Sequence, residues 1–163
     1  MRSKRGKGTV FCITFEVQKV GKTQDIPHNN ENNNINYTGR TILVAEDVDI
    51  NQEIIEYFLK MTNASVELVK NGQQVVQAFL EAPEKYDLIF MDIQMPEMDG
   101  YEATRIIRNS DHPAAKTVPI IAMTANVLKE DIERCLAAGM NDHIGKPFEA
   151  DVVFSTMKKA FAE

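Results

Sequence analysis

Residues 89–100 read IFMDIQMPEMDG and carry an acidic residue at the end of an apolar run. The run Ile89–Met91 indicates a strand, Asp92 ends it, and the Met-Pro and Asp-Gly pairs that follow indicate a tight loop before the next element. An acidic residue in this position is most often a turn former or a helix cap. It also lies where open α/β sheets bind their ligands, so the rest of the sequence has to decide between the two interpretations.

Apolar runs alternate with amphipathic segments on both sides of this stretch. The predicted strands are 41–46, 64–70, 86–91, 118–124 and 142–146, and the predicted helices are 49–61, 72–82, 100–110, 128–140 and 149–161. Strands that are apolar throughout are typical of a parallel sheet covered by helices on both faces. The sequence therefore predicts a doubly wound α/β domain with a five-stranded parallel sheet and five helices.

The ends and faces of three of these helices can also be predicted. Asp49, followed by Gln52 three residues on, is the expected N-cap of the first helix, and Asn71 that of the second. Gly139 is the expected stop of the fourth helix. Helical spacing groups two sets of apolar residues on core-facing sides: Ile50, Ile54, Phe58 and Met61 in the first helix, and Leu128, Ile132, Cys135 and Leu136 in the fourth.

Composition excludes several classes of protein. The 163 residues include 24 acidic and 18 basic ones, giving a net charge of −6, which argues against nucleic acid as a partner. Cys12 and Cys135 have no motif spacing, which suits a reducing compartment. No apolar run reaches the roughly 18 residues of a membrane span, so we expect no membrane contact by this chain. A cytoplasmic location is expected, whether or not a longer protein that contains this chain is anchored in a membrane.

Polar side chains follow four of the predicted strands. They are Glu46 and Asp47 after the first strand, Asp92 after the third, Thr124 after the fourth and Lys146 after the fifth. Because parallel strands end at one edge of the sheet, these groups are expected to converge there. Converging carboxylates repel one another, and an all-oxygen set of this kind suits Mg²⁺. With a lysine and a hydroxyl to hold phosphoryl oxygens, the set is sufficient for phosphorylation of an aspartate.

These motifs resemble the receiver domain of two-component response regulators. The resemblance rests on Glu46-Asp47, FMDIQMPEMDG, IIAMTA and HIGKPF, in that order, and covers about residues 41–163. It implies a flavodoxin-like sheet with strand order 2-1-3-4-5 and a cis Lys146-Pro147 bond. It also implies the following roles: Asp92 as phosphoacceptor; Glu46, Asp47, Asp92 and the backbone carbonyl of Gln94 as Mg²⁺ site; Thr124 and the backbone of Ala125 as phosphoryl contacts; Lys146 as partner of Asp92 or of its phosphate.

One position departs from the usual pattern of this family. An aromatic Tyr or Phe usually stands three residues before the lysine and acts as a switch coupled to the threonine. Here the residue is His143, so Thr124 and His143 are the expected switch pair. Two interpretations stay open: His143 simply replaces the aromatic ring, or the switch is weaker or sensitive to pH.

The first forty residues suggest what the receiver is attached to. Residues 6–17, GKGTVFCITFEV, resemble the last glycine box and strand of a histidine-kinase ATP-binding domain, so 1–23 are predicted to be a remnant of that domain. Residues 24–40 are rich in asparagine and poor in apolar side chains, which predicts a linker before the receiver at 41–163. Residues 137–149, AAGMNDHIGKPFE, also resemble receivers of hybrid sensor histidine kinases.

The resemblance implies a place in a His-Asp phosphorelay. The chain is expected to accept a phosphoryl group from a histidine kinase domain, that of its own parent protein, and to pass it to a histidine phosphotransfer protein. It would be a signalling phosphoacceptor and not a kinase by itself. Two docking faces are open: the fourth helix, fifth strand and fifth helix around Ala125, His143 and Phe148, or the first helix near Ile50, Asn51 and Ile54.

Two alternative functions are weighed against this one. The first is a receiver-like interaction module that never takes phosphate, which the intact set of strand-end residues argues against. The second is a phosphatase of the haloacid-dehalogenase type, because Asp47-Val48-Asp49 resembles its Asp-x-Asp opening. In that family Asp47 would be the nucleophile, and Asp92 with its Met-Pro turn would have no role.

Overall fold

The computed structural model describes residues 2–4, 8–10, 35–126 and 128–162. The chain divides into two units, Met1–Asn33 and Asn34–Glu163, which are described separately. In the first unit β1 (Arg2–Lys4) pairs antiparallel with β2 (Gly8–Val10), with Ser3 opposite Thr9. The rest of the predicted kinase remnant, and residues 24–34 of the predicted linker, lie outside the described residues.

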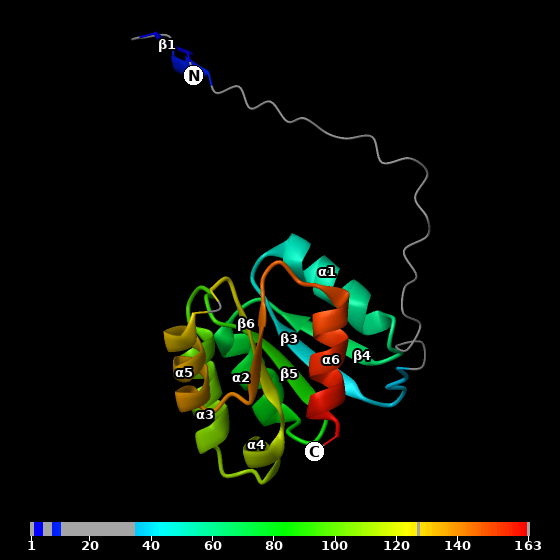
Figure 1. Cartoon of the computed structure of the whole chain (residues 1–163). Coiled ribbons are helices and arrows are strands. Elements are labelled where there is room, and N and C mark those ends of the chain that lie inside the picture. Colours follow the sequence, from blue (N-terminus) through cyan, green and yellow to red (C-terminus); the bar gives the residue numbers. More distant parts are fainter. Residues whose placement is uncertain (1, 5–7, 11–34, 127, 163) are drawn as a thin grey trace, which may run out of the picture. The chain divides into compact units, whose positions relative to one another are not determined.

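The second unit is a parallel sheet covered by helices (Figure 1). Its elements are β3 (Thr41–Ala45), α1 (Asp49–Lys60), β4 (Ser65–Val69), α2 (Gly72–Glu81), β5 (Leu88–Asp92), α3 (Gly100–Asn109), α4 (Ala114–Thr117), β6 (Ile120–Thr124), α5 (Lys129–Ala138), β7 (Asp142–Gly145) and α6 (Ala150–Ala160). The strand order β4-β3-β5-β6-β7 is 2-1-3-4-5 when counted within this unit. The predicted fold class and strand order are therefore confirmed.

The sequence predicted five helices, one fewer than the structure shows in this unit. Among the residues that the structure describes, this unit has a sixth helix, α4, a single turn of four residues between α3 and β6. The segment that contains it, 111–117, is too short to show a helical period, and Pro113 at its start favours a loop in sequence-based reasoning.

The core consists of two layers, one on each face of the sheet. On one face, α1 and α6 contribute Ile55, Leu59, Val153 and Met157 against buried side chains of β3, β5 and β6. On the other face, α2, α3 and α5 cover the alternate side chains of the same strands. Every residue of β5 and β6 is buried, which explains why these strands read as continuous apolar runs in the sequence.

The register of the strands aligns their carboxyl ends. Asp92 lies opposite Met123, and Thr124 lies opposite Gly145, the residue before Lys146. Glu46 directly follows β3, whose last residue Ala45 lies opposite Met91. The sheet thus delivers the polar residues at the strand ends to a single edge, as predicted.

The predicted apolar faces of two helices were only partly right. In α1 the buried residues are Gln52, Ile55 and Leu59, whereas Ile50 is 58% and Ile54 is 38% exposed. Phe58, half-buried against Phe154, is the member of the predicted set that packs on the core. In α5, Cys135 is buried, but Leu128 and Leu136 are exposed. Both helices therefore present apolar side chains to the surface, and the periodicity alone did not indicate which side faces the sheet.

Two of the three predicted helix ends are confirmed. The Asn71 side chain accepts a hydrogen bond from the Gln74 N–H and caps α2, and Gly139 ends α5 in the left-handed region at φ 101°. The predicted cap Asp49 is instead the first helical residue of α1, after an N-cap at Val48 that makes no side-chain hydrogen bond. Its carboxylate pairs with Lys70 instead of capping the helix.

Arg108 joins the segments around α4 to the end of α5. Its guanidinium donates hydrogen bonds to the carbonyl oxygens of Gly139, Ala115 and Val118 and to Oδ1 of Asn141. Burial lowers the pKa of this group, and the four acceptors compensate for the water that it loses. A single cation therefore satisfies carbonyl groups that these loops would otherwise bury without partners.

The segment before β3 packs on the same unit. The Tyr37 N–H donates to the Thr62 carbonyl at 2.7 Å, and the Tyr37 ring lies 4.6 Å from that of Phe161 between centroids. Arg40 stacks over the same Phe161 ring. Residues 35–40 are thus attached to the end of α6. Across the described residues, no helix combines the length and apolar character needed to cross a membrane.

Gly100 allows the loop after β5 to return close to the strand end. Its N–H donates to the Ile93 carbonyl at 3.0 Å, and a Cβ atom at this position would lie 2.2 Å from the carbonyl oxygen of Asp92. No side chain fits in that space, so α3 begins in contact with the backbone of Asp92 only because residue 100 is glycine.

Gly100→Ala should therefore lower the free energy of unfolding by about 3 kcal/mol, because the clash is with backbone that cannot rotate away. Gly39→Ala is the matched control, since Gly39 has a φ of 87° but nothing within 4 Å of its would-be Cβ. The free energy of unfolding of Gly39→Ala should fall by only about 1 kcal/mol, the cost of placing alanine in the left-handed region. Urea denaturation measures both, and equal losses in the two variants would contradict the steric argument.

Candidate functional site

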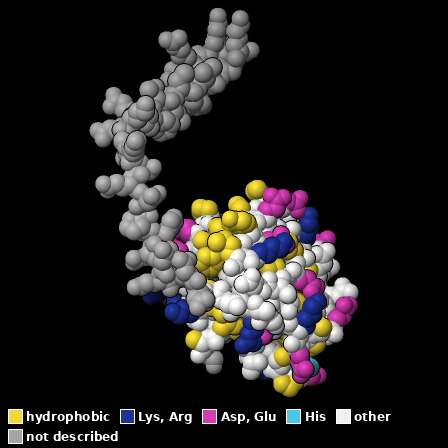
Figure 2. All heavy atoms as spheres, turned by 90° about the vertical axis from the view of Figure 1, so that its right-hand side faces the viewer, with side chains coloured by type: hydrophobic (Ala, Val, Ile, Leu, Met, Phe, Trp, Pro, Cys, Tyr) yellow, Lys and Arg dark blue, Asp and Glu magenta, His cyan; other side chains and the backbone are white. Residues whose placement is uncertain are grey.

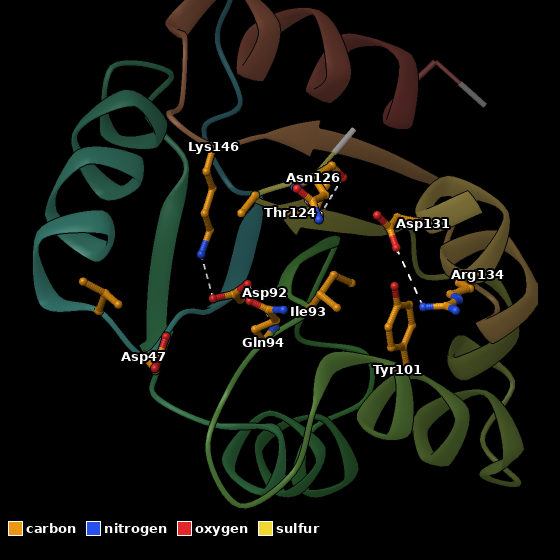
Figure 3. A pocket seen from close by; sticks show the side chains of 12 residues that line it. Asp47, Asp92, Ile93, Gln94, Tyr101, Thr124, Asn126, Asp131, Arg134 and Lys146 are labelled. Atoms are coloured by element: carbon orange, nitrogen blue, oxygen red, sulfur yellow. Dashed lines mark hydrogen bonds and ion pairs between the residues drawn. The ribbon is translucent and has the colours of Figure 1, made fainter. Parts of the chain in front are cut away.

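A cavity of about 350 Å³ opens at the carboxyl ends of β5 and β6 (Figure 3). It is lined by Asp47, Val48, Asp92, Ile93, Gln94, Tyr101, Thr124, Ala125, Asn126, Asp131, Arg134 and Lys146. Six of the eight residues predicted from the sequence are in this list. Of the other two, Glu46 is fully buried directly after β3, and His143 lies on β7 opposite Ala122.

Lys146 joins two carboxylates from different strands. Its Nζ lies 2.6 Å from Oδ2 of Asp92 and 2.6 Å from Oε2 of Glu46. Glu46 is 0% and Asp92 is 4% exposed, so both charges are removed from water and depend on this ammonium for compensation. The Lys146-Pro147 bond that follows is cis, as the resemblance implied.

The protonation of Asp92 reflects this environment. Burial raises the pKa of the Asp92 carboxyl above its ordinary value; the hydrogen bond from Lys146 opposes that increase, and the charge of Glu46 adds to it. For Lys146, burial lowers the pKa, but the hydrogen bonds to Asp92 and Glu46 outweigh it, so the pKa lies above its ordinary value. The lysine therefore stays charged, while the charged form of Asp92 is made costly by burial.

Three carboxylates meet closely enough to share a cation. One oxygen each from Glu46, Asp47 and Asp92 can be chosen so that all lie within 4.8 Å of one another. Oε2 of Glu46 is buried and accepts no well-directed hydrogen bond from the described residues. An all-oxygen set with an unsatisfied lone pair fits Mg²⁺, which binds one or two carboxylates and retains several waters. Gln94, whose carbonyl is the further expected ligand, lines the same cavity.

Thr124 and Ala125 both line the cavity, and Figure 3 shows Thr124 across it from Asp47. The Thr124 hydroxyl donates to the Asn126 carbonyl at 3.0 Å and accepts from the Asn126 N–H at 3.1 Å. It is 7% exposed and belongs to a closed turn with Asn126. The Thr124 hydroxyl would have to turn away from Asn126 before it could bind a group in the cavity.

His143 is half-buried and lies beside Asp142, with Nδ1 3.6 Å from the Asp142 carboxylate. It is on the strand next to β6 but does not line the cavity. Thr124 and His143 are thus on neighbouring strands, and their expected coupling as a switch stays a prediction.

Sequence reasoning missed two residues that hold Glu46. The Asn51 amide donates to Oε1 of Glu46 at 2.9 Å, and the buried Gln52 amide donates to the Glu46 carbonyl at 2.6 Å. Both belong to the first turn of α1, five and six residues beyond Glu46. The only signal in the sequence was a pair of amides shortly after an acidic strand end.

The sequence analysis also did not predict the end of the cavity that lies away from the carboxylates. Tyr101 from α3 and Asp131 and Arg134 from α5 line it, and the last two form a loose ion pair at 3.9 Å (Figure 3). Burial raises the pKa of Tyr101 to about 12, so its phenol stays protonated. The cavity therefore has an acidic end at β3 and β5 and a mixed polar end between α3 and α5.

Comparison with known proteins agrees with this geometry. The model of the response regulator receiver domain family matches residues 42–158. Probable histidine kinase 4 of rice (Oryza sativa subsp. japonica) is 40% identical over an alignment 139 residues long, which covers 74% of this chain and 14% of the rice protein. Histidine kinase 2 of Arabidopsis thaliana is 35% identical over an alignment 172 residues long, which covers 93% of this chain. The chain spans 14% of the length of either kinase.

Two solved structures are similar in fold and sequence. One is the receiver domain of the sensor histidine kinase PA1611 from Pseudomonas aeruginosa PAO1, with a magnesium ion in its active-site cleft. It has a TM-score of 0.70 and 40% identity, covering 77% of this chain and all of that one. The other is the receiver domain of Ssk1 from Saccharomyces cerevisiae, solved with the phosphotransfer protein Ypd1. It has a TM-score of 0.66 and 32% identity, covering 74% and 87%.

The family match covers well over half of the chain, and the fold and the strand order agree with it. The chain therefore belongs to the response regulator receiver domain family.

Proposed function

We propose that this chain takes a phosphoryl group from a phosphohistidine onto Asp92, in the presence of Mg²⁺, and passes it to a histidine phosphotransfer protein. The observation that carries the proposal is the ammonium of Lys146, 2.6 Å from the Asp92 carboxylate at the mouth of an acidic cavity. It supplies a cation beside a nucleophile that burial has made costly to keep charged.

In the forward step, a carboxylate oxygen of Asp92 attacks phosphorus, the N–P bond breaks, and the imidazole leaves with the bonding electron pair. The product is an acyl phosphate on Asp92. The Lys146 ammonium pairs with one phosphoryl oxygen, and the Thr124 hydroxyl and the Ala125 N–H hold another. The hydroxyl reaches the phosphoryl group by exchanging its bonds with Asn126, and this exchange signals phosphorylation toward β7 and His143.

Glu46, Asp47, Asp92 and the Gln94 carbonyl would hold the Mg²⁺. When bound, it would supply positive charge that offsets the negative charge of the carboxylates and the phosphoryl oxygens. Asp47 is the most accessible of the three acids, which suits it as a direct ligand. The magnesium ion in the similar receiver domain of PA1611 supports this assignment.

The surface of α1 suits a helical partner. Val48, Ile50, Ile54, Tyr57 and Met61 are all exposed, and the last four recur at intervals of four, three and four residues. Figure 2, which views the side of the molecule carrying α1 and α6, shows a gathering of hydrophobic side chains there. Val48 also lines the cavity, so a helix docked on this stripe would bring its histidine toward Asp92. The complex of Ssk1 with Ypd1 supports a phosphotransfer protein as the occupant.

The parent protein is proposed to be a hybrid histidine kinase. The relatives are histidine kinases, and the alignment with the Arabidopsis kinase covers 93% of the chain, well beyond residues 42–158. This supports residues 1–23 as the end of a catalytic domain and 24–40 as the linker to the receiver at 41–163. The kinase domain of the same parent would then be the phosphoryl donor.

Incubation with acetyl phosphate tests the proposed acceptor. Intact mass should increase by one phosphoryl group in the parent chain with Mg²⁺, but neither without Mg²⁺ nor in Asp92→Asn. If Asp47→Asn abolished labelling while Asp92→Asn retained it, Asp47 would be the nucleophile, as in a haloacid-dehalogenase-type phosphatase. A folded chain that gains no phosphoryl group under any condition would be a phosphate-independent interaction module.

Asp92→Asn should raise the free energy of unfolding in Mg²⁺-free buffer near neutral pH. The pKa of Asp92 is raised in the folded state, so its charge is a penalty at pH values above that pKa, and the penalty disappears as the pH falls through it. The gain over the parent should therefore shrink on acidification, and also on adding Mg²⁺. Urea denaturation at several pH values measures it, with exposed Asp111→Asn as control. A gain that grows on acidification would contradict the assignment.

The α1 stripe should be the phosphotransfer docking surface. The double variant Ile50→Ala and Ile54→Ala should weaken binding of Ypd1, used as probe, by about 10-fold or more, since each truncated apolar anchor costs about 1 kcal/mol. Leu136→Ala, which removes a similarly exposed side chain from α5, should leave the Kd unchanged. Calorimetry measures both. The reverse pattern would move the docking surface to α5, β7 and α6.

A further inference from the structure

Glu46 is the most deeply buried charge of the site and has a partner on each oxygen. Oε1 accepts from the Asn51 amide at 2.9 Å and from the Val48 N–H at 3.3 Å. Oε2 faces the Lys146 ammonium at 2.6 Å. The carboxylate plane is therefore fixed by an amide on one side and a cation on the other.

Asn51 is the stronger of the two donors to Oε1, and it is itself held firmly. Its backbone N–H donates to the Val48 carbonyl at 3.0 Å, within the turn that starts α1. The neighbouring Gln52 amide holds the main-chain carbonyl of Glu46 and, at 3.2 Å, that of Val69. Two consecutive amides of α1 thus hold the side chain and the main chain of one acidic residue.

We propose that Asn51 is a positioning residue for the cation site: its amide holds Oε1 of Glu46 so that Oε2 faces Lys146 and the shared metal position. This rests on the proposed Mg²⁺-dependent function but assigns a role to a residue outside the expected ligand set. Outer partners that orient carboxylate ligands usually change metal affinity by 10-fold or more.

The physical reason lies in the burial of Glu46. Without the Asn51 amide, Oε1 keeps only the longer bond from Val48, so a fully buried carboxylate is left under-satisfied. The carboxylate is then free to rotate, and its oxygens are no longer held in the arrangement that brings one of them within 4.8 Å of an oxygen of Asp47 and of Asp92. Mg²⁺ affinity falls although no predicted ligand has changed.

Titration calorimetry with MgCl₂ tests this on the full chain. Asn51→Ala should bind Mg²⁺ about 10-fold more weakly than the parent. Glu53→Ala, an exposed position in the same helix, should bind like the parent. In a Glu46→Gln background, Asn51→Ala should have no further effect, because the carboxylate that it positions is gone.

A second measurement avoids the double variant. The rise in melting temperature caused by a fixed Mg²⁺ concentration should be smaller in Asn51→Ala than in the parent, whatever their stabilities in EDTA. An unchanged Mg²⁺ Kd in Asn51→Ala, or an equal loss in the Glu46→Gln background, would overturn the proposal. Failure of the parent to take phosphate on Asp92 would instead overturn the proposed function, so the two failures are distinguishable.

Discussion

The ion pair of Lys146 with Glu46 and Asp92 is the interaction on which the site depends. Parallel strands bring buried carboxylates together at one edge of the sheet, and each would be costly there without a compensating charge. The lysine reaches them from the end of β7, so β3, β5, β6 and β7 have to be in place before the charges are balanced. The nucleophile, the cation site and the fold are therefore linked by a single ammonium group.

Much of the fold was predictable because the buried strands are continuous apolar runs in the sequence. β5 and β6 are buried on both faces and read as apolar runs, so their ends and the polar residues after them were found from the sequence. The buried and exposed faces of α1 were not predicted correctly. Ile50 and Ile54 are apolar but exposed, while the buried position beside them is taken by the polar Gln52. Periodicity assumes that apolar means buried, and a helix that presents a binding stripe violates that assumption.

The candidate site was predictable to the extent that it is built from strand ends. The residues that orient those groups were not predicted, because they depend on tertiary contacts between elements. Asn51 reaches Glu46 only because α1 folds back over the end of β3, and Arg134 reaches the cavity only because α5 packs beside α3. Arg108 is similar: in the sequence it is an ordinary helical arginine, and in the fold it serves four acceptors.

The contact between Gly100 and the Asp92 backbone has a consequence for anyone who wishes to rebuild this domain. The nucleophile, the loop after it and the start of α3 share one close backbone approach, so none of them can be redesigned or exchanged alone. A chimaera that imports a different loop has to import its glycine and its helix start as well. Residues 92–100 are thus the smallest portable unit of this site, and recombination between related domains should be tolerated at its boundaries rather than inside it.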